Sequence, residues 1–326
     1  MISARPDLVL VLLLAAMPVQ AAKRAKPAPL PPLPPLELPA TAPLIEAEIA
    51  GQPVRLTVDL GGDDIVQINP ESPLRAVLAA ATRPDGVAAD RGQYRVAVGQ
   101  AALAIPFTRE AVMIAGRPVR ARVLQPGAAP PGQPEGSDGV IGLPLLPHDR
   151  VTLRLRPATS ADGSQNLPAR IGRSDAWGFD WLLGKAGELD VEIHPLRATS
   201  VISAAAASAL AAVGDGRLVG GVSRVTISFG AARPVRRLEL ARPVAIANLV
   251  VQGGLVRLYD WAGRTNLPPE AQAETELAVV GKRGRQGAWR NIKLGRDVLG
   301  ACASIGWQRD AERPQLSSFT LLCPRP

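Results

Sequence analysis

The sequence contains few of the residues from which metal centres and cofactor sites are usually built. It has two cysteines and two histidines among 326 residues. These are too few for a zinc finger or a multi-cysteine metal cluster. No Gly-x-Gly-x-x-Gly segment follows a predicted strand, and the Walker, HExxH and GxSxG motifs are absent. We therefore expect no cofactor and no bound metal.

Aromatic residues and lysines are also scarce. Aromatic residues make up 3% of the chain, and 32 of the 37 basic residues are arginines, because only five are lysines. The arginines are scattered, whereas a nucleic-acid-binding protein is expected to cluster its basic residues and interleave aromatic side chains. We therefore expect no nucleic-acid partner. The net charge of +8 permits an anionic surface as a partner without implying one.

Only one long apolar run is present, at Leu8–Ala16. Val19 and Ala21 follow it at the small-residue positions of a signal-peptidase site, which predicts a signal peptide over residues 1–21. The run is too short to cross a bilayer, which requires about 20 residues. We therefore expect an exported protein, periplasmic or secreted, with no integral membrane segment after cleavage.

Export makes the two cysteines informative. Cys302 and Cys323 lie near the C-terminus and flank a predicted hairpin. Two cysteines in an oxidising compartment tend to form a disulfide. The alternative is a pair of buried free thiols, and the sequence leaves this choice open.

Proline and glycine are abundant, and they argue against long helices. The chain has 32 prolines and 31 glycines, and each proline inside a helix costs about 3 kcal/mol. Eight prolines between residues 22 and 43 favour an extended polyproline spacer there. With 47% hydrophobic residues, the remainder can bury a core, and we expect it to be all-β with few short helices.

Two halves of the folded part follow the same order of elements. Two segments predict helices, Leu74–Ala81 and Ser203–Val213. Short apolar segments between turns predict strands at Leu44–Ile49, Val54–Asp59, Tyr94–Val98, Ala101–Ile105, Val112–Ile114, Val119–Leu124 and Val151–Leu155, and then at Leu189–Ile193, Val225–Phe229, Leu238–Leu240, Val244–Val251, Leu255–Tyr259, Glu276–Val280 and Phe319–Leu322. We predict a lobe over 44–170, a connection over 171–186 and a second lobe over 187–326.

Three segments carry a family resemblance. Val58–Gly62 resembles the Asp-Thr/Ser-Gly-Ala motif of aspartic proteases of the retropepsin-like and pepsin-like superfamily. Asp138–Leu146 resembles the apolar-apolar-Gly segment of that family, and Gly295–Leu299 resembles its second copy. The resemblance covers roughly residues 44–323. It implies two tandem β-barrel lobes with a peptide-binding cleft between them.

The chemistry of that family requires two aspartates. The two carboxyl groups share one proton, so that one acts as a base on water and the other polarises the scissile carbonyl. This sequence departs from the pattern, since Leu60 replaces the hydroxyl residue of the motif. Alignment of the halves also places His194, followed by Pro195, where the second aspartate should be. Asp190 lies four residues earlier, inside the predicted strand, and should point elsewhere.

The resemblance implies a set of site residues. Asp59 is the candidate catalytic residue, although its partner aspartate is missing, and His194 stands at the partner position. The implied binding residues are Gly61, Gly62, Gly142, Tyr94 and Tyr259. A simpler interpretation is that Asp59 only caps a turn.

Three hypotheses remain open for function. In the first, the protein is a non-catalytic descendant that keeps a cleft for a peptide or protein ligand. In the second, it is an active aspartic endopeptidase that uses Asp59 with His194 or with a second chain. In the third, it is an unrelated exported β-rich structural or binding protein. The oligomeric state is left open.

Overall fold

Strands make up most of the folded chain. The computed structural model describes residues 31–80, 90–98, 101–172, 176–258, 289–310, 313 and 316–325. The predicted all-β class with few short helices is confirmed. The helices are α1 (Leu74–Ala79), α2 (Ala204–Gly214) and α3 (Arg296–Leu299), with the 3-10 turns η1 (Leu143–Leu145) and η2 (Gly184–Ala186).

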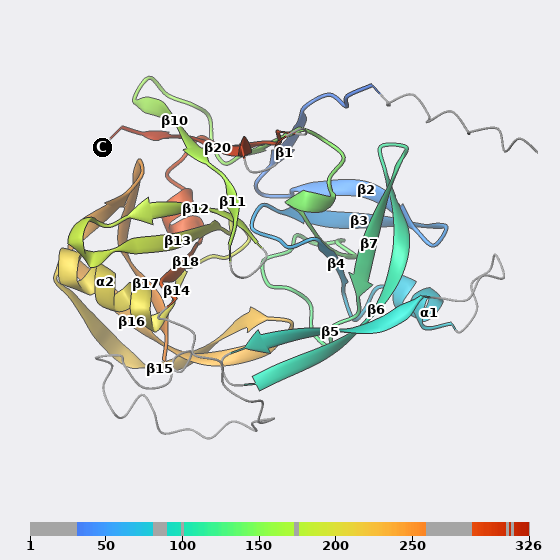
Figure 1. Cartoon of the computed structure of the whole chain (residues 1–326), viewed down its shortest axis with the longest axis horizontal. Helices are drawn as coiled ribbons and strands as arrows, with labels where there is room; N and C mark the ends of the chain where they lie inside the picture. The colour runs from blue at the N-terminus through green and yellow to red at the C-terminus, as the bar shows by residue number, and fades with distance from the viewer. Residues whose placement is uncertain are drawn as a thin grey trace, which may run out of the picture. The chain divides into compact units, whose positions relative to one another are not determined.

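The first half of the chain builds a seven-stranded sheet (Figure 1). Its order is β2 (Leu44–Ile49), β3 (Gln52–Asp59), β8 (Gly139–Gly142), β4 (Ile65–Ile68), β7 (Arg117–Leu124), β6 (Ala101–Ile114) and β5 (Arg91–Val98). Alternate residues of β2 are buried, as expected for a strand with one face on a core. An additional pairing of β2 with β6 closes this sheet on itself.

The second half builds an eight-stranded sheet. Its order is β11 (Arg170–Ile171), β12 (Trp177–Leu182), β13 (Glu188–Ile193), β18 (Asn291–Leu294), β14 (Val201–Ile202), β17 (Leu249–Arg257), β16 (Ala231–Ile246) and β15 (Gly216–Ser228). From β12 onward this is the order of the first sheet with every strand number raised by ten. The β12–β16 pairing that would match β2–β6 is absent within the described part of the chain.

Strand directions repeat as well. The parallel pairs β3–β8 and β4–β7 recur as β13–β18 and β14–β17. The antiparallel pair β4–β8 recurs as β14–β18. The two halves therefore share one topology, although they are only weakly alike residue by residue.

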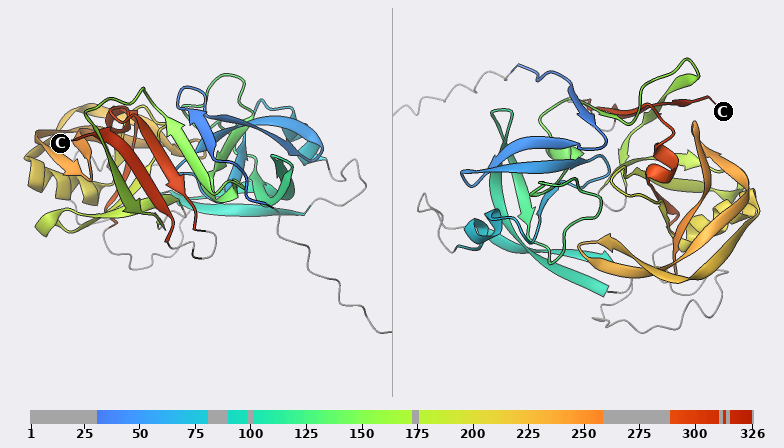
Figure 2. Two further views of the ribbon diagram at one scale, coloured as in Figure 1. Left: turned by 90° about the horizontal axis from the view of Figure 1, so that it is seen from above. Right: turned by 180° about the vertical axis from the view of Figure 1, so that it is seen from behind.

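A third sheet combines strands from both halves. Its order is β1 (Leu36–Pro39), β9 (Arg150–Arg154), β19 (Ser304–Gln308), β20 (Ser318–Pro324) and β10 (Asp162–Pro168). Figure 2 shows the red strands β19 and β20 beside the green strands that end the first half. The sulfur atoms of Cys302 and Cys323 lie 2.06 Å apart as a disulfide, and both residues are buried. The sequence left open whether the two cysteines form a disulfide or remain free thiols, and the structure shows the disulfide.

Two predicted boundaries are wrong. The spacer predicted over 22–43 contains β1, which pairs in parallel with β9. An edge position tolerates the missing N–H of Pro39, and Leu38 is buried in the core. The connection predicted over 171–186 contains β12, because Trp177 and Phe179 are also buried in the core and draw the segment into the second sheet.

Some predictions fall outside the described residues. The signal peptide predicted over 1–21 and the strand predicted at Glu276–Val280 are among them. Within the described part of the chain, no helix has the length and apolarity needed to cross a bilayer. Contacts divide the chain into residues 1–32 and 33–326, and all the strands and helices above belong to the second unit.

Candidate functional site

The first turn of the candidate site follows β3. Asp59 ends this strand and pairs with Gly142 of β8. The Gly62 N–H donates to the Asp59 carbonyl at 3.1 Å, and the Gly61 N–H donates to the Asp59 side chain (Oδ1) at 3.2 Å. Leu60 is fully buried in the core. Leu60 is therefore used for packing, at the position where the motif that this segment resembles has a hydroxyl residue.

The second turn follows β13 and has the same hydrogen-bond pattern. The Arg197 N–H donates to the His194 carbonyl at 3.0 Å, as Gly62 does to Asp59. In the first half Val58 pairs with Ile141, and the next residue, Asp59, pairs with Gly142. In the second half Ile193 pairs with Leu294, and the next residues along the two segments are His194 and Gly295. This register places His194 at the position that Asp59 holds in the first half.

The two turns meet tip to tip. His194 Nδ1 lies 3.5 Å from Asp59 Oδ2, and the two side chains are only 9% and 17% exposed. A Cβ added to Gly61 would lie 2.6 Å from His194 Cε1, and one added to Gly62 would lie 2.7 Å from the Gly142 Cα. Contacts this short require glycine. Gly61 therefore lies where the two turns meet, while Gly62 and Gly142 pack against each other within the first half.

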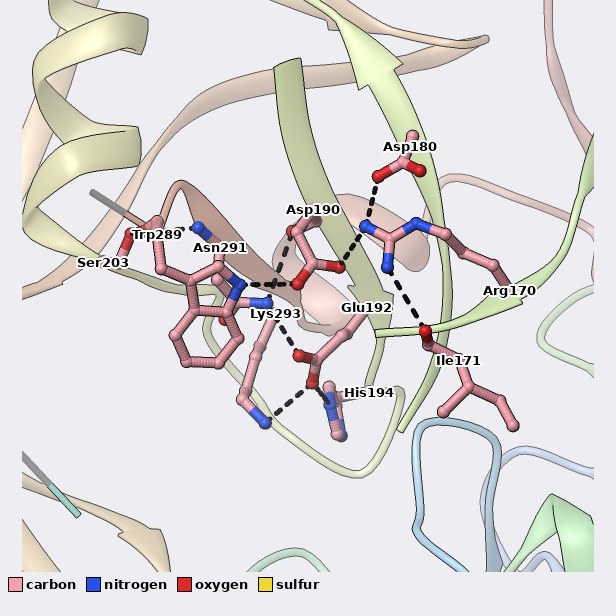
Figure 3. Close-up of polar contacts among 10 residues, drawn as sticks. All are labelled: Arg170, Ile171, Asp180, Asp190, Glu192, His194, Ser203, Trp289, Asn291 and Lys293. Carbon is pink, nitrogen blue, oxygen red and sulfur yellow. Dashed lines mark hydrogen bonds and ion pairs between the residues drawn. The ribbon is translucent and has the colours of Figure 1, made fainter. Parts of the chain in front are cut away.

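Behind His194 lies a buried chain of charges that the sequence analysis missed (Figure 3). Glu192 Oε2 is 2.8 Å from His194 Nε2 and 2.7 Å from Lys293 Nζ. The Asn291 amide donates to Glu192 Oε1 at 2.7 Å, and the Glu192 side chain is fully buried. Glu192 lies in β13 and His194 follows the strand directly, two residues later, so the two side chains project to the same side. That spacing is the signal that would have indicated the pair.

The imidazole of His194 therefore lies between two carboxylates. Its Nδ1 faces Asp59 and its Nε2 faces Glu192. A histidine donates through both nitrogens only when both are protonated. The arrangement joins four side chains from the two halves into one line of polar contacts, from Asp59 through His194 and Glu192 to Lys293.

Both carboxyl groups are held in the ionised state. Burial raises the pKa of Asp59, but the nearby His194, the Gly61 N–H and Arg197 together lower it below its ordinary value. Burial also raises the pKa of Glu192, and Lys293 and His194 outweigh this and hold it well below its ordinary range. At neutral pH neither group carries the proton that an aspartic dyad would share.

Asp190 belongs to a different cluster, as expected. Its Oδ1 contacts Arg170 at 3.0 Å, and its Oδ2 accepts a hydrogen bond from the Trp289 indole at 2.6 Å (Figure 3). Burial raises its pKa, and the hydrogen bond from Trp289 opposes this. Asp190 therefore does not replace the missing aspartate.

Arg197 connects the site to the long β15–β16 hairpin. Its guanidinium donates to the carbonyl of Thr226 at 3.0 Å and also to that of Ile227. Burial lowers the pKa of Arg197, and the charges of Asp59 and Glu192 oppose this. The arginine thus holds the hairpin against the turn that carries His194. The sequence analysis assigned it no role.

The remaining predicted binding residues lie apart from the charged chain. The Tyr94 ring packs edge-on against Phe229, with ring centres 5.8 Å apart, and the Arg122 guanidinium lies over it at 5.1 Å. Tyr259 lies outside the described residues. A cavity of about 670 Å³ is lined by parts of β16, β17 and the C-terminal segment, and neither Asp59 nor His194 lines it.

Comparisons with known proteins do not place the chain in a family. No protein-family model matches the sequence. A search of curated proteins also finds no match.

Proposed function

We propose that this chain is an exported, peptidase-like binding protein that lacks aspartic-protease activity and takes an extended peptide or protein segment as its ligand. The observation that carries the proposal is the position of His194. It stands in the second half where Asp59 stands in the first, and the two side chains meet at 3.5 Å.

The chemistry of an aspartic peptidase supports the loss of activity. Such an enzyme needs one ionised and one protonated carboxyl group at the same water molecule. Here Asp59 is ionised and faces an imidazole. Glu192, the acid in contact with the other side of His194, is fully buried and bound to Lys293, so it has no access to a substrate.

Two parts of the proposal rest on the sequence. The peptide ligand follows from the resemblance of Val58–Gly62 and Asp138–Leu146 to aspartic proteases. That resemblance concerns the scaffold and does not by itself assign a function. A periplasmic or secreted location follows from the apolar run at Leu8–Ala16, and the Cys302–Cys323 disulfide is compatible with it.

The contact between Asp59 and His194 also favours a second candidate, an active endopeptidase. In that mechanism the Asp59 carboxylate would take a proton from water, and the protonated imidazole would donate to the substrate carbonyl. The short separation of the two groups supports this candidate, while the burial of both side chains opposes it.

Cleavage assays separate the two candidates. The purified full chain is incubated with a fluorogenic peptide library from pH 3 to pH 8, beside the Asp59→Asn variant. The proposed function predicts no cleavage by either protein above background. Cleavage by the wild type that Asp59→Asn abolishes would overturn it in favour of the endopeptidase.

A binding selection tests the ligand class. A phage-displayed library of random linear peptides is selected on the immobilised wild-type chain, and enriched peptides are measured by calorimetry. The proposal predicts enrichment of peptides that bind saturably. If no peptide is enriched and no cleavage occurs, the third hypothesis, a structural β-rich protein, replaces the proposal.

A further inference from the structure

A small apolar cluster lies directly beyond the turn that carries Asp59. It consists of Ile65, Ile105, Phe107 and Leu124, all buried and separate from the main core. Ile65 begins β4, immediately after the Asp59 turn, and the other three belong to β6 and β7. We call these four residues the apolar pocket. It is formed entirely by the first half of the chain.

An aromatic ring from the second half covers this pocket. Phe229, at the tip of the β15–β16 hairpin, packs against the cluster together with Tyr94 of β5. The neighbouring Gly230 also touches the first half, since a Cβ added there would lie 2.7 Å from the Ala128 Cβ. Arg197 secures the same hairpin through the carbonyl of Thr226.

Phe229 is an unusual residue for its position. It has a φ of +50° and Gly230 has a φ of +82°, so the pair forms a two-residue turn with both φ values positive. A bulky side chain rarely adopts this conformation. Two other hairpin turns, Ala50-Gly51 and Ala115-Gly116, have alanine at the same place with φ values of +52° and +49°. The turn itself therefore does not require an aromatic residue.

The strands beside the pocket are suited to an extended chain. β5 and β15 are the last strands of their sheets, and no described strand pairs with their outer edges. Figure 1 shows β5 next to the β15–β16 hairpin, and the contact of Tyr94 with Phe229 confirms that they meet. An exposed strand edge can add an extended peptide through main-chain hydrogen bonds, with a side-chain pocket providing selectivity.

We propose that the apolar pocket binds an aromatic side chain of an extended peptide ligand, and that Phe229 is a built-in competitor for that place. The inference rests on the proposed peptide-binding function and specifies it. A ligand must displace the Phe229 ring, so the wild type binds more weakly than a chain without that ring. Burial of one phenylalanine side chain corresponds to roughly a tenfold to hundredfold change in an equilibrium constant.

The test uses Phe229→Asn and Phe229→Ala in the full chain. Asparagine suits this turn better than phenylalanine, and alanine already occupies it elsewhere in the chain, so both variants should keep the hairpin. Two neutral peptides serve as probes, Ac-Thr-Ala-Phe-Ala-Thr-amide and its Phe→Ala counterpart. Binding is measured by calorimetry and by methyl NMR of Ile65 and Ile105.

We expect both variants to bind the phenylalanine peptide at least about tenfold more tightly than the wild type does. The alanine peptide should show no gain, and the methyl signals of Ile65 and Ile105 should shift only with the phenylalanine peptide. Equal binding of the two peptides to both folded variants would overturn the inference and leave Phe229 as a packing residue.

A failure of this inference differs from a failure of the proposed function. If the wild type binds selected peptides but the variants show no gain for phenylalanine, only the pocket assignment fails. If the variants gain phenylalanine binding but the wild type selects no peptide, the pocket stands and the proposed function fails. Should both variants fail to fold, Ile105→Met in the wild-type background replaces them. The inference then predicts that this change alters the affinity of selected aromatic peptides and leaves that of the others unchanged.

Discussion

The Asp59 carboxylate and the His194 imidazole face each other from equivalent turns of a repeated topology, with Oδ2 and Nδ1 3.5 Å apart. In the scaffold that the chain resembles, two aspartates would meet at this point. Here an imidazole faces the single aspartate, and Glu192 and Lys293 extend the line of contacts into the second half. The contact therefore links the two halves of the chain at the tips of their equivalent turns.

Gly61→Ala should destabilise the protein by about 1 to 3 kcal/mol through overpacking. The new Cβ would lie 2.6 Å from His194 Cε1 and 2.7 Å from the Ile193 carbonyl oxygen, which belongs to the backbone and has little freedom to move. Gly127→Ala is the matched control, because nothing lies within 4 Å of its added Cβ. Urea unfolding measures both. Equal unfolding free energies of Gly61→Ala and Gly127→Ala would show that the two turns can move apart without loss of stability.

Glu192→Gln should cost about 3 to 5 kcal/mol, because it leaves the Lys293 ammonium without its buried counter-charge. The Lys293 nitrogen lies 2.7 Å from Glu192 Oε2, and the Glu192 side chain is fully buried. The double variant Glu192→Gln/Lys293→Met should recover part of the loss, since no uncompensated lysine remains. A double variant no more stable than Glu192→Gln in denaturant titration would contradict this account.

Acidification should destabilise the protein through Asp59 and Glu192. Their folded-state pKa values lie below the ordinary values of 3.8 and 4.5, so the unfolded chain takes up protons first. Their contribution to stability is therefore complete above about pH 4.5 and is lost as the pH falls towards the folded-state values. Asp190, whose pKa is raised, acts in the opposite sense.

Urea midpoints of the wild type and Glu192→Gln, measured from pH 7 to pH 2.5, test this pH dependence. The fall in stability below pH 4.5 should be steeper for the wild type, because the variant has lost one of the two depressed carboxyl groups. Parallel curves for the two proteins would rule out Glu192 as a source of the acid sensitivity.

Removal of the disulfide by Cys302→Ser/Cys323→Ser should lower the unfolding free energy by about 3 kcal/mol, the chain-entropy value for a loop of this size. The two cysteines are 21 residues apart and join the segment between α3 and β19 to β20. Calorimetry measures the loss. Mass spectrometry after iodoacetamide treatment provides a check, since the native chain should be alkylated only after reduction and unfolding.

Local sequence patterns determined much of the fold. Apolar segments separated by Gly and Pro turns predicted all-β architecture, and β2, β13 and β20 form close to where they were expected. The order of residues in the two halves was also enough to place His194 opposite Asp59. These features follow from periodicity and turn chemistry, which act over a few residues and can be read directly from the chain.

Only the tertiary structure decided which side chains complete the site. Lys293 reaches Glu192 through the parallel pairing of β13 with β18, across about 100 residues of chain, and Phe229 reaches Tyr94 from the opposite half. Likewise, β1 forms a strand because it pairs with β9, which lies more than 100 residues later in the chain. Contacts of this kind depend on which strands become neighbours, and that outcome is set by burial over the whole fold rather than by any local pattern.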